Sequence, residues 1–94
     1  MRTKARIRYR KLERQQRQVS EQLRNSLTGD QRRILLLSSL GYGHGEIARE
    51  LALPEDYVVH FALGMVQRLN KSGVIPSPEW RHVLAWAEEV GILG

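Results

Sequence analysis

Residues 41–73, GYGHGEIARELALPEDYVVHFALGMVQRLNKSG, contain the pattern that decides the fold. Their second half repeats apolar side chains at the spacing of one helical face: Val58, Phe61, Ala62, Met65, Val66 and Leu69. Pro54 stands just before this stripe, where its fixed φ and missing N–H suit the first turn of a helix. The pattern predicts a long helix that begins near Pro54 and ends at 70–73.

A shorter helix is predicted directly before the long one. Ile47, Ala48 and Leu51 follow the spacing i, i+1, i+4, and the helix should end near Leu53. A short helix joined by a tight turn to a longer, amphipathic one is the outline of a helix-turn-helix, although many small helical bundles share it.

A further helix is predicted before this pair, with clear signals at both ends. Thr28 and Gln31 have the spacing of a capping box, in which each side chain bonds the backbone N–H of the other residue. Gly41 should end the helix in a left-handed conformation. Its inward face should consist of Ile34, Leu35 and Leu37.

The last predicted helix begins after Ile75. Ser77 should be its N-cap and Pro78 its first residue, and Gly91 should end it. Its buried stripe should be Trp80, Val83, Leu84 and Ala87. The chain has 94 residues, enough for one domain with a modest core. We therefore expect an all-α fold, with a four-helix body at 27–94 preceded by a basic N-terminal helix or arm at 1–26.

The charge is distributed very unevenly between these two parts. Residues 1–26 carry nine basic and two acidic side chains, whereas residues 27–94 carry six basic and eight acidic ones. A cationic segment on a slightly acidic body indicates a polyanionic partner, first of all DNA, with structured RNA as the other nucleic acid. The residues expected to contact phosphates are Arg2, Lys4, Arg6, Arg8, Arg10, Lys11, Arg14 and Arg17.

The basic segment itself has the composition of a helix, because it lacks Pro and Gly and is rich in good helix formers. A weak heptad seam runs along it: Ala5, Tyr9, Leu12, Gln16, Val19, Leu23 and Ser26. Three interpretations stay open: a solvated arm, a helix that pairs with a second copy, and a helix that packs on the body.

Several classes of function are not expected. The chain has no cysteine, and His44, His60 and His82 are too far apart in sequence to suggest a zinc site. No Ser/His/Asp order or converging pair of carboxylates suggests catalysis, so we expect no enzyme, no metal, no cofactor and no small-molecule ligand. No apolar stretch approaches the roughly 18 residues of a membrane span, and no apolar segment of a secretory signal follows the basic N-terminus. A cytoplasmic protein is expected.

Gly41, followed by Glu46-Ile47-Ala48-Arg49 and Leu51, is the most specific motif of residues 27–94. With this motif, residues 27–94 resemble the DNA-binding domain of LuxR/GerE-type regulators. The other matching residues are Leu27-Thr28, Ile34-Leu35, Leu37, Leu53, Val58, Met65, Leu69 and Gly91-Ile92-Leu93.

The resemblance implies a bacterial transcriptional regulator, bound to the nucleoid, whose third body helix enters the major groove of DNA. The positions implied to face DNA are Tyr57, Val59, His60, Leu63, Gln67 and Arg68. It also implies pairing of two copies through the last helix, and the N-terminal helix is the alternative dimer contact.

This sequence departs from the family at the DNA-facing positions. Val59 stands where Lys is usual, and Glu55 and Asp56 place negative charge where the helix should approach phosphates.

Unusual apolar residues also suggest a different class of function. Leu36 and Leu40 form an i, i+4 pair, Val59 and Leu63 form another, and Trp86 lies off the stripe of its helix. Such residues together indicate either a protein-interaction or self-association surface, with Leu36, Leu40 and Trp86 as candidates, or a face covered by the N-terminal helix.

Overall fold

A computed structural model describes the backbone of residues 2–93 and the side chains of residues 14–93. This part of the chain contains no strand and consists of helices joined by short connections, so the expected all-α class is confirmed. The helices are α1 (Arg2–Ser26), α2 (Gly29–Ser39), α3 (His44–Leu51), α4 (Glu55–Lys71) and α5 (Trp80–Glu89).

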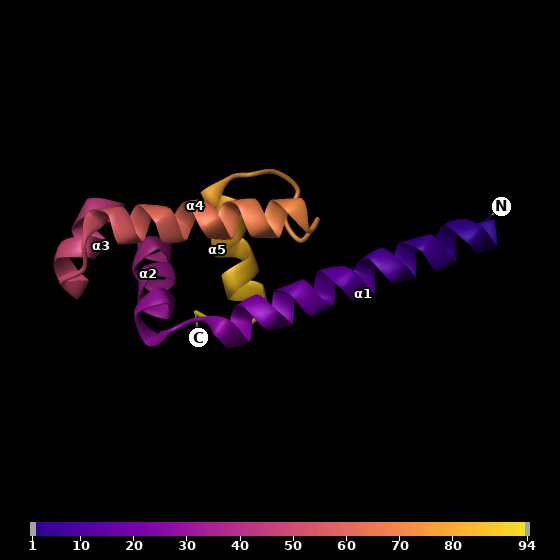
Figure 1. Cartoon of the computed structure of the whole chain (residues 1–94), viewed down its shortest axis with the longest axis horizontal. Coiled ribbons are helices and arrows are strands. Elements are labelled where there is room, and N and C mark those ends of the chain that lie inside the picture. The colour runs from indigo at the N-terminus through magenta and orange to yellow at the C-terminus, as the bar shows by residue number, and fades with distance from the viewer. Residues whose placement is uncertain (1, 94) are drawn as a thin grey trace.

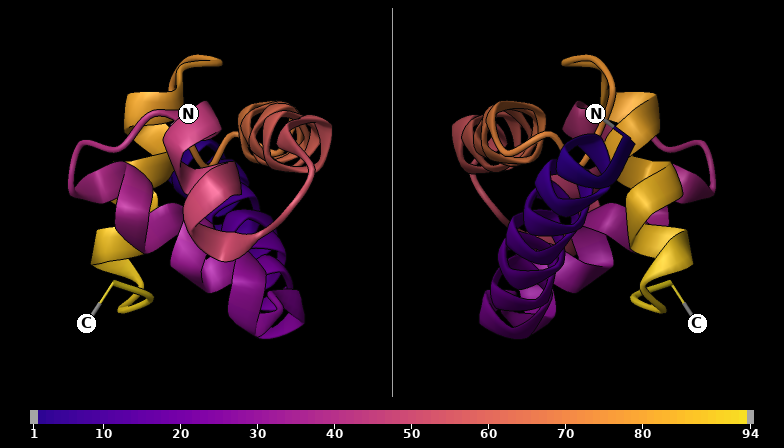
Figure 2. Two further views of the ribbon diagram at one scale, coloured as in Figure 1. Left: turned by 90° about the vertical axis from the view of Figure 1, so that its left-hand side faces the viewer. Right: turned by 90° about the vertical axis from the view of Figure 1, so that its right-hand side faces the viewer.

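Helices α2 to α5 form the body, and α1 extends away from it (Figure 1). Helix α4 packs against α3 and α5, and α2 packs against the same two helices. The N-terminal half of α1 projects beyond the body in Figure 1, and in the two end-on views of Figure 2 α1 lies behind the other helices on the left and in front of them on the right. The molecule is therefore elongated, with extents of 54 × 21 × 19 Å.

The core of the body is built around the buried face of α4. The predicted apolar stripe is confirmed, because Val58, Ala62, Met65 and Leu69 are buried and Phe61 and Val66 are partly buried. One cluster joins the first part of α4 to α2 and α3, and a second joins its later part to α1, α2 and α5. Phe61 contacts both clusters, so α4 links the two halves of the core.

The ends of α2 are formed as the sequence predicts. The backbone N–H of Gln31 donates to Thr28 Oγ1 at 3.1 Å, and the N–H of Thr28 donates to Gln31 Oε1 at 3.0 Å. Such a reciprocal cap stabilises a helix start by about 1 kcal/mol. Gly41 follows the helix with φ +98°, a value that favours glycine.

The turn between α3 and α4 is short and sharply bent. Ala52 adopts the left-handed conformation, with φ 55°, and the N–H of Leu53 donates to the carbonyl of Ala48 at 2.9 Å. Pro54 is the N-cap of α4, as its position in the sequence suggested. This geometry, together with the contacts between the two helices, fixes the direction in which α4 leaves α3.

The start of α5 differs from the prediction. The helix begins at Trp80, and neither Ser77 nor Pro78 has the predicted role. The Ser77 hydroxyl donates instead to Glu79 Oε2 at 2.6 Å, and Glu79, in an extended conformation, is the N-cap. The hydrogen bonds from Ser77 and Arg81 hold the pKa of Glu79 below its ordinary value, because both stabilise the carboxylate.

The C-terminal half of α1 packs on the body. Leu23 is only 3% exposed within the core, and the neighbouring heptad position Val19 is partly buried against the same cluster. Trp86 is 4% exposed, and its indole Nε1–H donates to Ser20 Oγ at 2.8 Å. The prediction that Trp86 belongs to an exposed interface is therefore wrong, because α1 covers it. For this half of α1, packing on the body is confirmed, and the solvated arm is excluded.

Candidate nucleic-acid interface

The face of α4 opposite its buried stripe is open to solvent. His60, Leu63 and Gln67 are exposed there, with Leu63 at 52%. At 3.6 residues per turn, Val59 lies on one edge of this face and is half-buried. Thus the structure places these four predicted DNA-facing residues on the open side of α4 or at its edge.

The other edge of this face borders α1 and α2. Arg68 is exposed on this edge, and Tyr57 lies there with its hydroxyl 3.4 Å from Gln31 Nε2, which donates to it. Gln31 also belongs to the cap of α2. The start of α2 is therefore tied to the first turns of α4.

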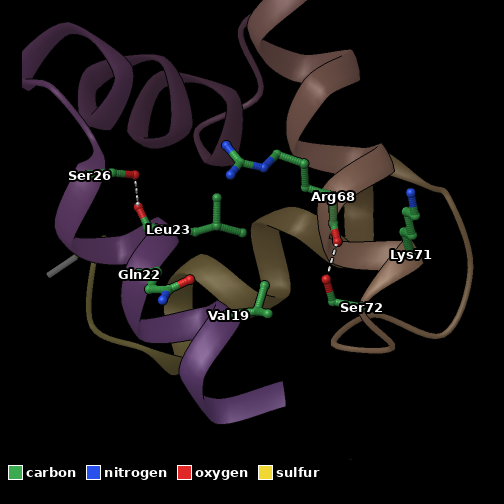
Figure 3. Close-up of a pocket in the computed structure, with 7 residues that line it drawn as sticks. All are labelled: Val19, Gln22, Leu23, Ser26, Arg68, Lys71 and Ser72. Atoms are coloured by element: carbon green, nitrogen blue, oxygen red, sulfur yellow. Dashed lines mark hydrogen bonds between the residues drawn. The ribbon is translucent and has the colours of Figure 1, made fainter. Parts of the chain in front are cut away.

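A groove runs along this edge of α4, and we call it the α1–α4 groove. It consists of two adjoining hollows of about 330 and 470 Å³, which share Leu23, Ser26 and Arg68. The first hollow is also lined by Leu27, Gln31, His60, Phe61, Gly64 and Met65. The second is also lined by Val19, Gln22, Lys71 and Ser72 (Figure 3).

Arg68 lies between the two hollows and extends from α4 toward the end of α1 (Figure 3). The hydroxyls beside it bond backbone carbonyls: Ser72 Oγ donates to the carbonyl of Arg68 at 2.8 Å, and Ser26 Oγ to that of Leu23 at 3.0 Å. Lys71 lies one turn after Arg68 on α4 and is exposed. Both cations also suit the negative end of the α4 dipole.

The groove carries positive charge without a compensating acid. Among the side chains described, ion pairs join Asp30 to Arg33 and Glu79 to Arg81 and His82, and none involves Arg68 or Lys71. The described residues that line the groove include no Asp or Glu. Another hollow, of about 310 Å³ against α1, contains both Arg17 and Glu89, so its charge is mixed.

The cations of α1 are not gathered in this groove. Arg14 and Arg17 are exposed on α1, and Arg17 lines the mixed-charge hollow. Arg24 is exposed near the end of the helix, where its carbonyl accepts a hydrogen bond from Arg32 Nη2 at 3.3 Å. The other predicted phosphate contacts have side chains outside the described residues: Arg2, Lys4, Arg6, Arg8, Arg10 and Lys11.

Apolar side chains are exposed in a second region, on α2 and the turn after it. Leu36 and Leu40 are 41% and 66% exposed, as their unusual positions in the sequence suggested. Tyr42, at 46%, lies beside them in sequence and was not among the predicted interface residues.

Sequence reasoning also missed Gly64 and Lys71, which line the groove. The spacing His60, Gly64, Arg68 at i, i+4, i+8 could have identified one edge of α4. Only the position of α1 turns that edge into the wall of a groove.

Within the described residues, no group of three or more His, Cys, Asp or Glu side chains could hold a metal ion. None of the helices in residues 2–93 combines the length and apolar character that crossing a membrane requires. No family model, curated protein or solved structure matches this chain.

Proposed function

We propose that this chain is a DNA-binding transcriptional regulator of LuxR/GerE type, in which α4 enters the major groove and the basic helix α1 contacts phosphates. The observation that carries the proposal is the α3–α4 pair: α3 and the core hold one face of α4, and the opposite face, with His60 and Gln67, is open. A helix presented in this way fits the width of the major groove.

Helices α4 and α1 contribute differently to DNA binding in this proposal. Gln67 on the open face of α4 can hydrogen bond to base edges, and Arg68 at the border of this face can contact either a base edge or a phosphate. Glu55 and Asp56 at the start of α4 repel phosphates, so most of the affinity comes from the cations of α1. Binding of this kind is strong at low salt and depends only weakly on DNA sequence.

The proposal includes a homodimer in the bacterial cytoplasm, associated with the nucleoid when bound to DNA. Of the two dimer contacts that the sequence suggests, the N-terminal half of α1 is favoured over α5. The C-terminal half of α1 already covers Trp86 of α5, whereas the N-terminal half projects from the body (Figure 1).

A protein-interaction module is the second candidate function. It is favoured by the exposure of Leu63 in the middle of the α4 face and of Leu36 and Leu40 on α2. A single exposed apolar side chain is common on a protein surface, but several together suit a protein partner.

Replacing Val59 with Lys separates these two functions. If α4 faces DNA, Val59→Lys adds a cation at the edge of the contact, and affinity for a duplex should rise roughly three- to tenfold at low salt. If this face of α4 binds protein, the partner would bury the lysine charge, and Val59→Lys should weaken association instead. Fluorescence anisotropy with a labelled duplex measures the first effect, and sedimentation velocity measures the second.

The matched control is Ala85→Lys, which adds the same charge at an exposed position of α5. The DNA proposal requires Val59→Lys to strengthen binding more than this control. Equal strengthening by the two variants, or weaker binding by Val59→Lys, contradicts the placement of α4 against DNA.

A further inference from the structure

We propose that the α1–α4 groove receives one sugar-phosphate strand of the DNA duplex, with Arg68 and Lys71 contacting phosphates and Gly64 allowing close approach to α4. This inference rests on the proposed function and identifies the part of the body that holds the DNA backbone. It places the strand beside α4, on the edge that faces α1. These contacts add to those that the cations in the N-terminal half of α1 make with phosphates.

The charge of the groove suits a polyanion. Arg68 lines both hollows, Lys71 lines the larger one, and neither has an acidic partner among the described residues. Gln22 adds a neutral amide to the lining, while the hydroxyls of Ser26 and Ser72 donate to backbone carbonyls. A phosphodiester strand would thus meet two cations and an amide donor, and no carboxylate within this lining.

The spacing of the two cations also suits a strand. Arg68 and Lys71 are three residues apart on α4, which corresponds to an axial rise of about 4.5 Å. Successive phosphates of one DNA strand advance by about 3.4 Å along the duplex axis, and their separation in space is larger because the strand also winds around that axis. Two flexible side chains at this spacing can contact neighbouring phosphates of the same strand.

Gly64 is an independent sign that something outside the chain approaches α4. It lies in the interior of the helix, where glycine weakens a helix relative to alanine. Its φ is not in the left-handed region, and a Cβ built there would meet no neighbouring heavy atom within 4 Å. No contact within the described protein therefore requires glycine, and its missing side chain leaves the wall of the smaller hollow open.

Gly64→Glu tests the close approach. The new side chain fills the groove wall with a negative charge, and affinity for a labelled duplex of about 20 base pairs should fall at least tenfold at low salt. Such a duplex is longer than the 54 Å molecule at 3.4 Å per base pair. Ala85→Glu on the exposed face of α5 is the matched control, because it makes the same change in net charge.

The double variant Arg68→Gln/Lys71→Gln tests the phosphate contacts. Each lost contact lowers the steepness of the salt dependence by about 0.9, so the slope of log K against log salt should flatten by about 2. The control is Arg49→Gln/Arg81→Gln, two exposed cations that do not line the groove. Thermal unfolding followed by circular dichroism verifies that each variant remains folded.

The outcomes separate this inference from the proposed function. If wild-type protein binds the duplex but Gly64→Glu behaves like Ala85→Glu, or the Arg68/Lys71 variant keeps the wild-type slope, the groove does not hold the strand and the proposed function survives. If wild-type protein does not bind the duplex at all, the proposed function itself fails. A single-stranded oligonucleotide that binds as tightly as the duplex, and is weakened equally by Gly64→Glu, overturns the assignment to duplex DNA.

Discussion

Replacing the six cations in the N-terminal half of α1 with glutamine is expected to lower affinity for duplex DNA about a thousandfold at low salt. Each lysine or arginine that neutralises a phosphate releases a counterion, and each such contact contributes about 0.9 to the salt dependence. The slope of log K against log salt should therefore flatten by about 5. The residues to replace are Arg2, Lys4, Arg6, Arg8, Arg10 and Lys11.

This change should have little effect on stability, because the N-terminal half of α1 projects from the body (Figure 1). Anisotropy titrations at several salt concentrations measure affinity and slope, and circular dichroism follows helix content and unfolding. The double variant Arg49→Gln/Arg81→Gln serves here too as a control for loss of charge from the body. If the six-residue variant keeps the wild-type slope, these cations do not contact phosphates.

Leu23→Ala is expected to destabilise the protein by about 2–5 kcal/mol, the range for truncating a buried leucine. Among the described side chains of α1, residues 14–26, Leu23 is the one that is buried, and it belongs to the same core cluster as Leu35, Met65 and Leu69. A domain of this size has a total stability of about 5–15 kcal/mol. The midpoint of thermal unfolding should therefore fall by roughly 10 °C or more.

Leu36→Ala is the matched control, because it removes the same atoms from a side chain that is 41% exposed. Its unfolding midpoint should remain close to that of the wild type. If Leu23→Ala were no more destabilising than Leu36→Ala, α1 would not be packed on the body in solution. The groove between α1 and α4 would then lose one of its walls.

The helices α2, α3 and α4 could be predicted from the sequence because each has strong local signals. The capping box at Thr28, the glycine at Gly41 and the stripe that begins at Val58 depend on residues a few positions apart. Local hydrogen bonds and helical periodicity are therefore sufficient to define these elements. The sequence predicts that α3 ends near Leu53, and in the structure its last residue is Leu51, two positions earlier.

The start of α5 and the environment of Trp86 could not be predicted in the same way. Ser77 has the chemistry of an N-cap, but its hydroxyl bonds the Glu79 side chain, and several serines or acids near a helix start can compete for that role. Trp86 is buried where the C-terminal half of α1 packs on the body, and its indole N–H donates to Ser20, 66 positions away. No local pattern contains that contact.

The sequence does not predict where α1 packs, and the candidate site depends mostly on that position. A weak heptad seam can be exposed to solvent, pair with a second copy of the chain or pack on the body, and the sequence does not distinguish these cases. Packing of Val19 and Leu23 on the body settles the case for the C-terminal half of α1. It also creates the α1–α4 groove, which explains why Gly64 and Lys71 were not recognised as candidate site residues.

The most direct test of the account is a titration of the full-length wild-type chain against a labelled duplex of about 20 base pairs across a series of salt concentrations. If roughly six to nine cations neutralise phosphates, log K should fall with log salt at a slope between about −5 and −8. Binding should be tight at the lowest salt and similar for duplexes of different sequence. No binding at the lowest salt, or an affinity that hardly changes with salt, would contradict a DNA-binding function based on this basic helix.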